Sequence, residues 1–565
     1  MNKKWEICEC DYELVKKVSS ENHISELMAN ILVNRGITEK KDIEIFLNPT
    51  RSDFHDPFLM PDMEKAVERL QKAIEKNEKI IIYGDYDVDG VTSITVLKKF
   101  LQDRGMTNIG YYIPKRLDEG YGLNKNAVKK IYDEGYTLIV TVDCGITGME
   151  EIEYAYELGM EVIVTDHHEP LDEIPKCIAV IDCKRKDSEY LFNGLAGVGV
   201  VFKLTQALSK RLGLEEKEYL KYLDIVCIGT ISDIVPLVDE NRVISKLGLK
   251  LVAQTKCVGL RSLLEENVGK NNIINANTVS FGIAPRINAC GRIGYETEAV
   301  KLFMTDNLVE SKKLTESLNV YNKTRQEIEK NIFEEAKEII EKNNLQERNT
   351  IIIGKEGWHH GVIGIVASKI TELYFKPTIL IGFEGDIGKG SGRSVPGFDL
   401  HDALHKYGGY LDKYGGHEMA VGVTVNKNNF DKFAEELENY AQSVHTEQLV
   451  PIISIDKEIT TKELNLNMVE SLMELEPYGT SNKVPIFLIK NLKIDSIRTL
   501  VEGKHLKLTL QDGTNIINAI GFNLGYYAND FLLGDKVDII GMIEINTFNN
   551  IKTVQINMKD MRKSY

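Results

Sequence analysis

The sequence predicts an α/β protein of several domains that ends in a small β-barrel. Its 565 residues exceed what one hydrophobic core normally holds, and suggest roughly three to four domains. Apolar runs of strand length alternate with helical patterns between residues 80 and 181, and a second pattern of this kind runs from Thr350 to about His445. In the first of these regions, the alternation favours a parallel sheet with right-handed crossovers. From Pro451 onward, short β-rich runs separated by turns predict the barrel.

The composition excludes some classes of protein and leaves the function open. Hydrophobic residues make up 43% of the chain and charged residues 27%, as in ordinary globular proteins. No apolar run has the length of a membrane span and the first residues lack a signal core, so we expect a cytoplasmic protein with no membrane partner. The eight cysteines form no C-x-x-C pair and are expected to be reduced thiols. A net charge of -16 argues against a basic coat for duplex DNA, but not against a narrow channel with a few arginines.

An acidic loop after the first strand organises the chain. The apolar run at residues 80–83 predicts a buried strand, and residues 92–100 predict a helix. Three aspartates lie between them at alternate positions: Asp85, Asp87 and Asp89. Alternate side chains of an extended segment point the same way, so we expect these carboxylates to crowd one spot. Crowded carboxylates repel unless a cation neutralises them, and oxygen ligands suit Mg²⁺ or Mn²⁺. The alternative is an acidic loop in water.

Two further predicted strands end in residues that bind metals. The run at 138–142 is followed by Asp143, and the run at 162–165 is followed by Asp166, His167 and His168. The candidate ligands of two cations are Asp87, Asp89, Asp143, His167 and Asp233. Two-metal sites often share a bridging carboxylate, for which Asp143 is the natural candidate, and imidazole with carboxylates suits Mn²⁺. In the alternative, Asp166 caps the following helix and both histidines lie on the surface.

The remaining elements follow from periodicity and capping signals. Residues 1–50 alternate short helical patterns with polar turns. Helices are predicted at 63–76, 124–134, 149–158, 195–212, 218–228 and 308–342, and Asn124 is the expected cap of the second. Further strands are predicted at 108–113, 178–181, 486–489 and 537–541. The pattern at 308–342 lasts about nine turns, which is long enough to bridge two lobes.

Phosphate-binding residues are expected in the second α/β region. A glycine-rich turn is predicted at 390–394, where Ser391, Arg393 and Ser394 offer hydroxyls and a guanidinium to a phosphate. The alternative is an ordinary tight turn. His359 and His360 lack acidic partners and are expected in a turn that opens a helix at 362–373. Five residues are candidates to contact a single strand of nucleic acid: Arg286, Arg292, Arg325, Gln326 and Tyr121, whose ring could stack on a base. Salt bridges between lobes are the alternative for these arginines.

Motifs in order along residues 45–565 resemble those of the DHH phosphoesterases. Asp166-His167-His168 resembles the family signature, and segments 84–90, 142–145 and 229–233 are similar to its other metal motifs. Segments 112–116, 120–123, 195–199 and 283–292 are similar as well. The resemblance implies the same five metal ligands, and a contact of His168 with the scissile phosphate. Many members carry a histidine where this chain has Tyr83, so Asp85 becomes a candidate ligand of that cation.

The same resemblance implies substrate-binding residues and domains. Arg116 with Ser391, Arg393 and Ser394 resembles a pocket for a 5′-terminal phosphate. Further implied contacts are Gly416 and His417 of a DHH-associated domain, and Lys504, His505 and Lys507 of an OB-fold. The implied domains are an N-terminal cap at 1–50, a DHH catalytic domain at 51–305, a connecting helix at 306–345, a DHH-associated domain at 346–447 and the OB-fold at 448–565.

The implied activity is 5′-to-3′ hydrolysis of single-stranded DNA with two Mn²⁺ or Mg²⁺ ions, releasing 5′-mononucleotides, in recombination and repair. The expected partners are a single strand with a 5′ phosphate, a single-strand-binding protein and a helicase. Rival hypotheses are a phosphodiesterase of short oligonucleotides or cyclic dinucleotides, a pyrophosphatase, and an inactive DNA-binding scaffold. The added barrel and the 391–394 pocket argue against the small-substrate enzymes, and the complete ligand set argues against the scaffold.

Overall fold

The computed structural model describes residues 3–116, 118–268, 273–444 and 450–564, which form two compact units. The first unit contains Asp56–Asp233 and Lys250–Pro451. The second contains the N-terminal segment up to His55, Ile234–Leu249 and the C-terminal segment from Ile452. In these ranges no helix combines the length and the apolar character needed to cross a membrane.

A five-stranded parallel sheet organises the first unit. Its strands are β2 (Ile80–Gly84), β3 (Ile109–Tyr112), β4 (Leu138–Val142), β5 (Glu161–Thr165) and β6 (Ala179–Ile181), all of which the sequence predicted. They lie in the order β3-β2-β4-β5-β6, and every neighbouring pair is parallel. From β2 the chain passes to β3 on one side of that strand, whereas β4, β5 and β6 lie on the other side. In open α/β sheets such a switch point opens a crevice beyond the carboxyl ends of the strands, here those of β2 and β4.

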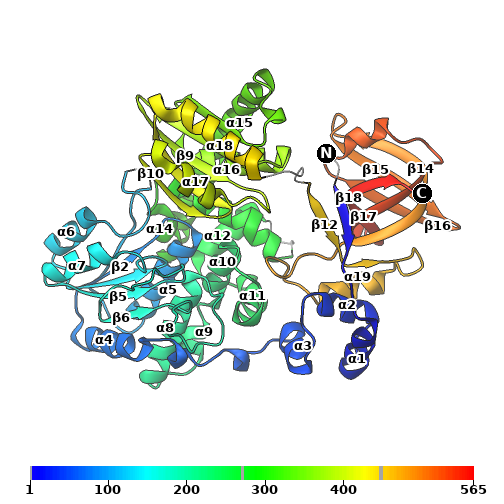
Figure 1. Ribbon diagram of the computed structural model, residues 1–565. Helices are drawn as coiled ribbons and strands as arrows, with labels where there is room; N and C mark the ends of the chain where they lie inside the picture. Colours follow the sequence, from blue (N-terminus) through cyan, green and yellow to red (C-terminus); the bar gives the residue numbers. More distant parts are fainter. Residues whose placement is uncertain (1–2, 117, 269–272, 445–449, 565) are drawn as a thin grey trace. The chain divides into compact units, whose positions relative to one another are not determined.

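Helices cover both faces of this sheet (Figure 1). On one face α6 (Lys125–Asp133) and α7 (Met149–Glu157) share a core with Ile81, Ile139 and Val162. Helices α4 (Met63–Lys76), α5 (Val88–Gln102) and α8 (Gly197–Arg211) lie against the sheet without joining that core. Burial on both faces explains why the strands read as continuous apolar runs. The predicted cap of α6 is confirmed, because the Asn124 side chain accepts the Ala127 N–H at 2.7 Å.

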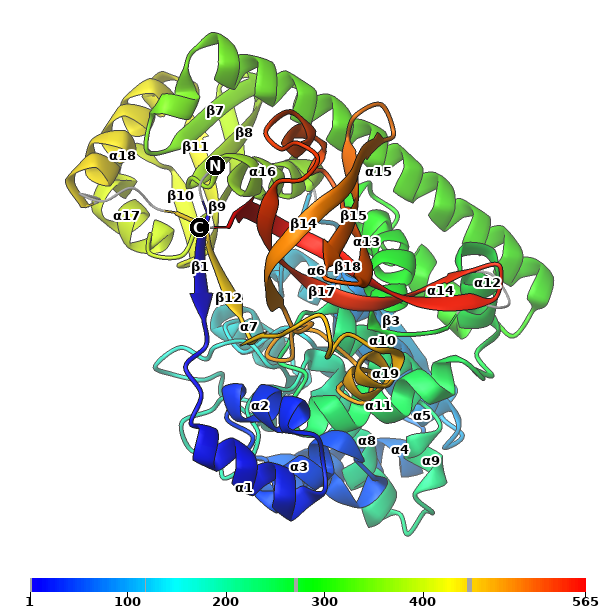
Figure 2. The same ribbon diagram turned by 90° about the vertical axis from the view of Figure 1, so that its right-hand side faces the viewer.

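A helical region follows the sheet in the chain. Its elements are α9 (Lys217–Leu220), α10 (Leu223–Ser232), α11 (Asp239–Val252), α12 (Val258–Asn267), the π-helix η3 (Thr278–Ile283), α13 (Ala284–Arg292) and α14 (Glu298–Met304). The single helix predicted at 218–228 is wrong, since α9 and α10 are separate and α10 continues through Gly229 to Ser232. Helix α15 (Leu308–Lys342) has the predicted bounds and is seen along its length in Figure 2.

The first unit also contains a mixed sheet. Its strands are β7 (Ile351–Glu356), β8 (Thr378–Glu384), β9 (Ile387–Arg393), β10 (Lys413–His417) and β11 (Ala420–Asn426), in the order β10-β11-β9-β8-β7. Helices α16 (His360–Tyr374), α17 (Leu400–Tyr407) and α18 (Phe430–Val444) pack against it. The turn predicted at 390–394 is wrong, because residues 390–393 complete β9 and only Ser394 lies beyond its end. Its glycines allow close packing: a Cβ on Gly390 would lie 2.7 Å from both Ile381 and Val423.

The second unit combines both ends of the chain. Strand β1 (Lys4–Ile7) pairs in parallel with β12 (Ile452–Ile455), and α1 (Tyr12–Asn22), α2 (Glu26–Asn34) and α3 (Lys40–Leu47) share one hydrophobic core with the barrel. The other elements are β13 (Lys457–Glu458), α19 (Leu466–Met473), β14 (Phe487–Leu500), β15 (His505–Asp512), β16 (Asn515–Gly521), β17 (Lys536–Phe548) and β18 (Ile551–Lys563). The barrel closes through the β14–β17 pairing; its β16–β18 pair is parallel, and β13 also pairs in parallel with β14. This is the predicted OB-type barrel.

Candidate metal centre and phosphate site

The acidic loop lies at the switch point and turns directly into a helix. Asp85 follows β2, and Asp87 is the N-cap of α5, where its Oδ1 accepts the Gly90 N–H at 3.0 Å. Asp89 lies in the first turn of α5. The expectation of three carboxylates on an extended segment is therefore wrong, since α5 begins before Asp89. A Cβ on Gly90 would lie 2.4 Å from the carbonyl oxygen of Asp85, so this tight transition needs glycine.

The other predicted ligands converge on His167. Its Nε2 lies 3.1 Å from Asp143 Oδ1, 3.8 Å from Asp89 Oδ2 and 3.7 Å from Asp233 Oδ2. Asp143 follows β4 with φ 58, a left-handed conformation that aspartate tolerates better than most residues. Asp233 is the C-cap of α10.

Three overlapping groups of side chains have the geometry of metal sites. In each group the potential ligand atoms lie within 4.8 Å of one another. The groups are Asp85, Asp87 and Asp143; Asp89, His167 and Asp233; and Asp143, His167 and His168. Asp143 belongs to two groups, as expected of a bridging carboxylate.

The electrostatics of this cluster favour divalent cations. Burial and neighbouring carboxylates raise the pKa of Asp89 to about 7 and that of Asp233 to about 9. They also raise the pKa values of Asp85 and Asp143 well above the usual range. Within the described ranges, Asp85 Oδ1, Asp143 Oδ1 and Asp233 Oδ2 are buried and make no hydrogen bond. Burial and the charge of His168 lower the pKa of His167 to about 3, which keeps it in the neutral form that binds metals. The donor set therefore fits Mn²⁺ or Mg²⁺.

Asp166 positions the second histidine. Its Oδ1 accepts from His168 Nδ1 at 2.7 Å, and its Oδ2 accepts the Ile146 N–H at 2.9 Å. Burial opposes the charged imidazole, but the hydrogen bond and charge of Asp166 hold the pKa of His168 above its ordinary value. Tyr121 donates its hydroxyl to the Asp143 carbonyl at 3.0 Å and lies 3.1 Å from His168 Nδ1. The alternative of a helix cap with two surface histidines is wrong, because Asp166 and His167 are buried.

Two backbone contacts that sequence reasoning missed hold the cluster together. Asp89 accepts the N–H groups of Gly197 at 2.6 Å and Val198 at 2.8 Å, which places its carboxylate at the N-terminus of α8. Asn288 of α13 accepts the Val88 N–H at 3.1 Å and so fixes the start of α5. Gly197, Val198 and Asn288 lie in segments similar to family motifs. None of the three is an acidic residue or a histidine, which are the residue types that predicted the other members of the cluster.

Tyr83 takes no part in the acidic cluster. Its hydroxyl donates to the Gly122 carbonyl at 2.9 Å, and its ring stacks on Tyr112 at 5.2 Å. Asp85 is therefore the additional carboxylate near Asp87 and Asp143.

An arginine cluster adjoins the acidic cluster. The Arg116 guanidinium lies 4.8 Å from the centre of the Tyr86 ring. Burial, then the charges of Arg116, Arg325 and Arg393, lower the pKa of Arg292 to about 10. Burial and Arg116 also lower the pKa of Arg393. These mutually repelling cations make a favourable place for an anion.

The mixed sheet brings its predicted residues to one end. Arg393 pairs with Ala420 across β9 and β11, and His417 pairs with Ala420 across β10 and β11. Gly416 has φ 135, and a Cβ there would lie 2.3 Å from the Ala420 carbonyl oxygen. A Cβ on Gly364 of α16 would meet Ser391 Oγ at 2.9 Å, so the helix approaches the pocket closely. The Ser394 hydroxyl instead donates to the Phe398 carbonyl at 2.6 Å.

The other residues predicted to contact a nucleic-acid strand differ in their interactions within the protein. Arg292 donates to the Gly361 carbonyl at 2.9 Å, and Arg286 donates to Asn319 Oδ1 at 2.7 Å. Arg325 forms an ion pair with Glu329 in its own helix rather than between lobes. Gln326 is exposed on α15. His359 accepts the Gly361 N–H and is the N-cap of α16, so the predicted turn does open a helix, although α16 begins at His360 rather than at 362. The expectation that this pair lacks an acidic partner is wrong, because His360 Nε2 lies 3.1 Å from Glu384 Oε1.

Candidate contacts on the barrel lie along β15. His505 packs edge-on against Phe522 at 5.3 Å, and Lys507 pairs with Arg498 across β14 and β15. Lys504 directly precedes the strand and is exposed.

Comparisons with known proteins cover nearly the whole chain. Family models match for the DHH family N-terminal domain at residues 79–230, the DHHA1 domain at 348–443 and the RecJ OB domain at 455–560. The single-stranded-DNA-specific exonuclease RecJ of Bacillus subtilis is 38% identical over 561 residues, 99% of this chain and 70% of that protein. The Escherichia coli exonuclease of the same name is 33% identical over 520 residues, 87% of this chain and 89% of that protein.

Solved structures agree with the sequence comparisons. The crystal structure of RecJ from Thermus thermophilus in complex with Mn²⁺ is 29% identical, with a TM-score of 0.86, and the match covers 100% of this chain and 80% of that one. The complex with Mg²⁺ from the same organism has a TM-score of 0.79, with coverage of 100% and 79%. The motifs, the three matched domains and the similarity over nearly the whole of this chain establish that it belongs to the RecJ family of DHH proteins.

Proposed function

We propose that this protein hydrolyses single-stranded DNA from a 5′-phosphorylated end and releases 5′-mononucleotides. The observation that carries the proposal is the place of Arg116 between the two charged clusters. Its charge acts on Asp85 on one side, and on Arg292 and Arg393 on the other. A terminal phosphate held by the arginines would lie next to the carboxylates, so the adjoining phosphodiester would be the bond in reach. Membership of a family of single-stranded-DNA-specific exonucleases supports this substrate.

Two Mn²⁺ or Mg²⁺ ions are the proposed cofactors. The proposed ligands are Asp85, Asp87, Asp89, Asp143, His167 and Asp233. Such ions, when bound, promote ionisation of the attacking water and neutralise charge on the phosphate.

The chain's own residues would orient and stabilise the reacting group. His168 is exposed enough to meet a phosphate, and Asp166 favours its charged form. A charged imidazole there would stabilise the negative charge that develops as the 3′ oxygen leaves. Asp166 and Tyr121 would hold the ring in place.

Selection of a single strand is assigned to the surrounding residues. The terminal phosphate would be bound by Ser391, Arg393, Gly416 and His417. Ser394 would shape the end of β9 next to this site. Arg286, Arg292 and Gln326 would contact the backbone, and His505 with Phe522 would stack bases on the barrel. We assign these roles to a catalytic domain at 51–305, a DHH-associated domain at 346–447 and an OB-fold at 448–565. Single-strand-binding protein and a helicase in the cytoplasm complete the proposed context of recombination and repair.

The test is digestion of a 5′-labelled single strand and its duplex with Mn²⁺. We expect labelled mononucleotide from the single strand only, and a loss of at least about 100-fold in Asp143→Ala, because the shared carboxylate is removed. Asp172→Ala is the matched control, since that side chain is 99% exposed in the same domain.

Other outcomes would contradict the proposal. Cleavage of dinucleotides or cyclic dinucleotides with long strands untouched would identify a small-substrate phosphodiesterase. Metal-dependent binding without cleavage of any phosphodiester would identify a scaffold.

A further inference from the structure

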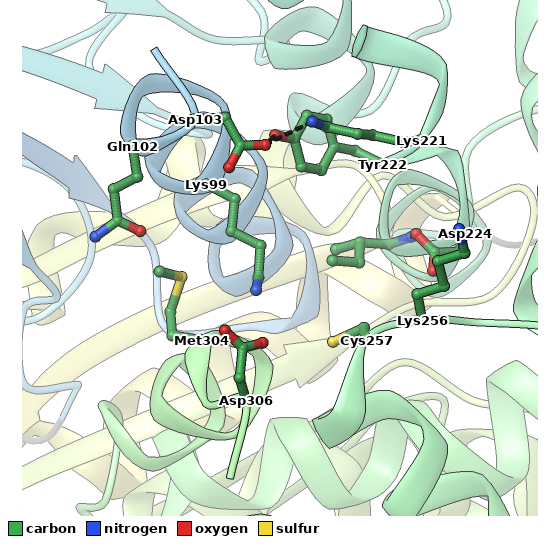
Figure 3. Close-up of a pocket in the computed structure, with 11 residues that line it drawn as sticks. Lys99, Gln102, Asp103, Lys221, Tyr222, Asp224, Lys256, Cys257, Met304 and Asp306 are labelled. Carbon is green, nitrogen blue, oxygen red and sulfur yellow. Dashed lines mark hydrogen bonds and ion pairs between the residues drawn. The ribbon is translucent and has the colours of Figure 1, made fainter. Parts of the chain in front are cut away.

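A polar cavity lies in the first unit, and no residue of the metal centre lines it. Its volume is about 340 Å³. Its walls come from the C-terminal end of α5, the start of α10, the segment before α12 and the end of α14 (Figure 3). This size lies at the lower end of the range of small-molecule sites.

The charges in this cavity are only partly neutralised. Asp103 pairs with Lys221 at 2.6 Å and accepts the Tyr222 hydroxyl at 2.5 Å. Asp224 accepts the Thr255 hydroxyl at 2.5 Å. Three other charged side chains form no ion pair within the described ranges: Lys99, Lys256 and Asp306. Figure 3 shows the Lys99 ammonium directed into the cavity, with Asp306 across from it.

These groups define the chemistry of a ligand. Two unpaired ammonium groups suit a phosphate, and the N-terminus of α12, which begins at Val258, adds a favourable potential for an anion. Asp306 offers an acceptor for a hydroxyl or amino group. Ile225 and Met304 provide an apolar wall.

We propose that the cavity binds a nucleoside monophosphate. Its phosphate would contact Lys99 and Lys256, its sugar hydroxyl would donate to Asp306, and its base would pack on Met304 and Ile225. None of these residues has been assigned to catalysis or DNA binding above.

Two helices connect this site to the metal centre. Helix α5 has Asp89 in its first turn and Lys99 near its other end. Helix α10 starts beside the cavity, and Asp233 is the C-cap at its other end. The two pack closely, because a Cβ on Gly229 would lie 2.3 Å from Thr92 Oγ1. A nucleotide bound in the cavity would thus act on both helices that position proposed metal ligands. Since mononucleotides are products of the proposed reaction, this regulatory step rests on the proposed function, whereas the binding itself does not.

The binding test is thermal unfolding of the full chain with 2′-deoxyadenosine 5′-monophosphate in the presence of a chelator. We expect saturable stabilisation, and an affinity lower by at least about tenfold in Lys99→Gln/Lys256→Gln, because two charge-assisted contacts are lost. The matched control is Lys217→Gln, a lysine of the neighbouring α9 that does not line the cavity. Deoxyadenosine, which lacks the phosphate, should stabilise at least about tenfold more weakly. Equal binding by the wild type and the double variant, or no stabilisation of the wild type, would overturn the proposal.

A second measurement separates regulation from binding. Without nucleotide, the double variant should cleave single strands at the wild-type rate. Added nucleotide should change the rate of the wild type and not that of the double variant. An equal response in both would overturn the regulatory step. If no form cleaves DNA, the proposed function fails, while the binding result with chelator still decides the cavity.

Discussion

Asp89 and Asp233 couple the metal centre to pH. Their pKa values of about 7 and about 9 lie far above the ordinary 3.8, so the folded protein without metal binds more protons than the unfolded chain in this interval. Stability of the metal-free protein should therefore fall as pH rises from about 4 to about 9. Metal binding requires deprotonated carboxylates, so Mn²⁺ should stabilise more at high pH.

Calorimetric unfolding with and without Mn²⁺ at about pH 6 and about pH 8.5 measures this effect. The increase in midpoint caused by Mn²⁺ should be larger at the higher pH, and Asp233→Asn should reduce the difference. An equal increase at both pH values would contradict the linkage.

Gly197 sets the position of the bridging carboxylate. A Cβ there would lie 2.7 Å from both Cβ and Oδ1 of Asp143, so alanine must displace that side chain. We expect Gly197→Ala to lower Mn²⁺-dependent cleavage by about 100-fold, because small misplacements at a reacting centre are costly. Gly409→Ala is the control, since nothing lies within 4 Å of its added Cβ. Steady-state kinetics compare the two, and similar loss in both would argue against displacement of Asp143.

At the scale of elements, the sequence predicted those helices and strands that are determined by interactions between residues close together in the chain. The strands of the parallel sheet are apolar runs between turn signals, and α15 is an amphipathic repeat without breakers, so both were predicted from sequence. The start of α5 was missed because the N-cap of Asp87 depends on a side-chain contact to Gly90. The break between α9 and α10 falls at Lys221 and Tyr222, where neither a glycine nor a proline marks it in the sequence.

Strand β9 was mistaken for a turn because its glycines, which usually indicate turns, here allow close packing against residues of the adjacent strands. Gly390→Ala would bring a Cβ to 2.7 Å from Ile381 and Val423, and overpacking of this kind costs about 1–3 kcal/mol. Gly422→Ala on the adjacent β11 is the matched control, with nothing within 4 Å of its Cβ. Urea unfolding followed by circular dichroism should show a lower midpoint for Gly390→Ala only. Equal stability of the two variants would mean that the sheet relaxes around the extra methyl group.

At the scale of the whole molecule, the pairing of β1 with β12 joins segments from the two ends of the sequence. No local pattern signals such a contact, so the N-terminal segment was expected to be a cap of its own. The metal centre was easier to predict, because parallel strands deliver their carboxyl ends to one edge and so bring Asp85, Asp143 and His167 together.

Each compact unit contains one of the two tryptophans, Trp5 in the second and Trp358 in the first. Trp5→Phe and Trp358→Phe variants therefore report the unfolding of one unit each by fluorescence. Leu508 is fully buried in the barrel core, and Leu380 is fully buried in the core around Trp358. Truncation of a buried leucine costs about 2–5 kcal/mol through lost burial and a residual cavity. Leu508→Ala should thus lower the denaturant midpoint reported by Trp5 and spare the one reported by Trp358, and Leu380→Ala should do the reverse. Parallel shifts of both signals in either variant would show that the two cores unfold as one cooperative structure.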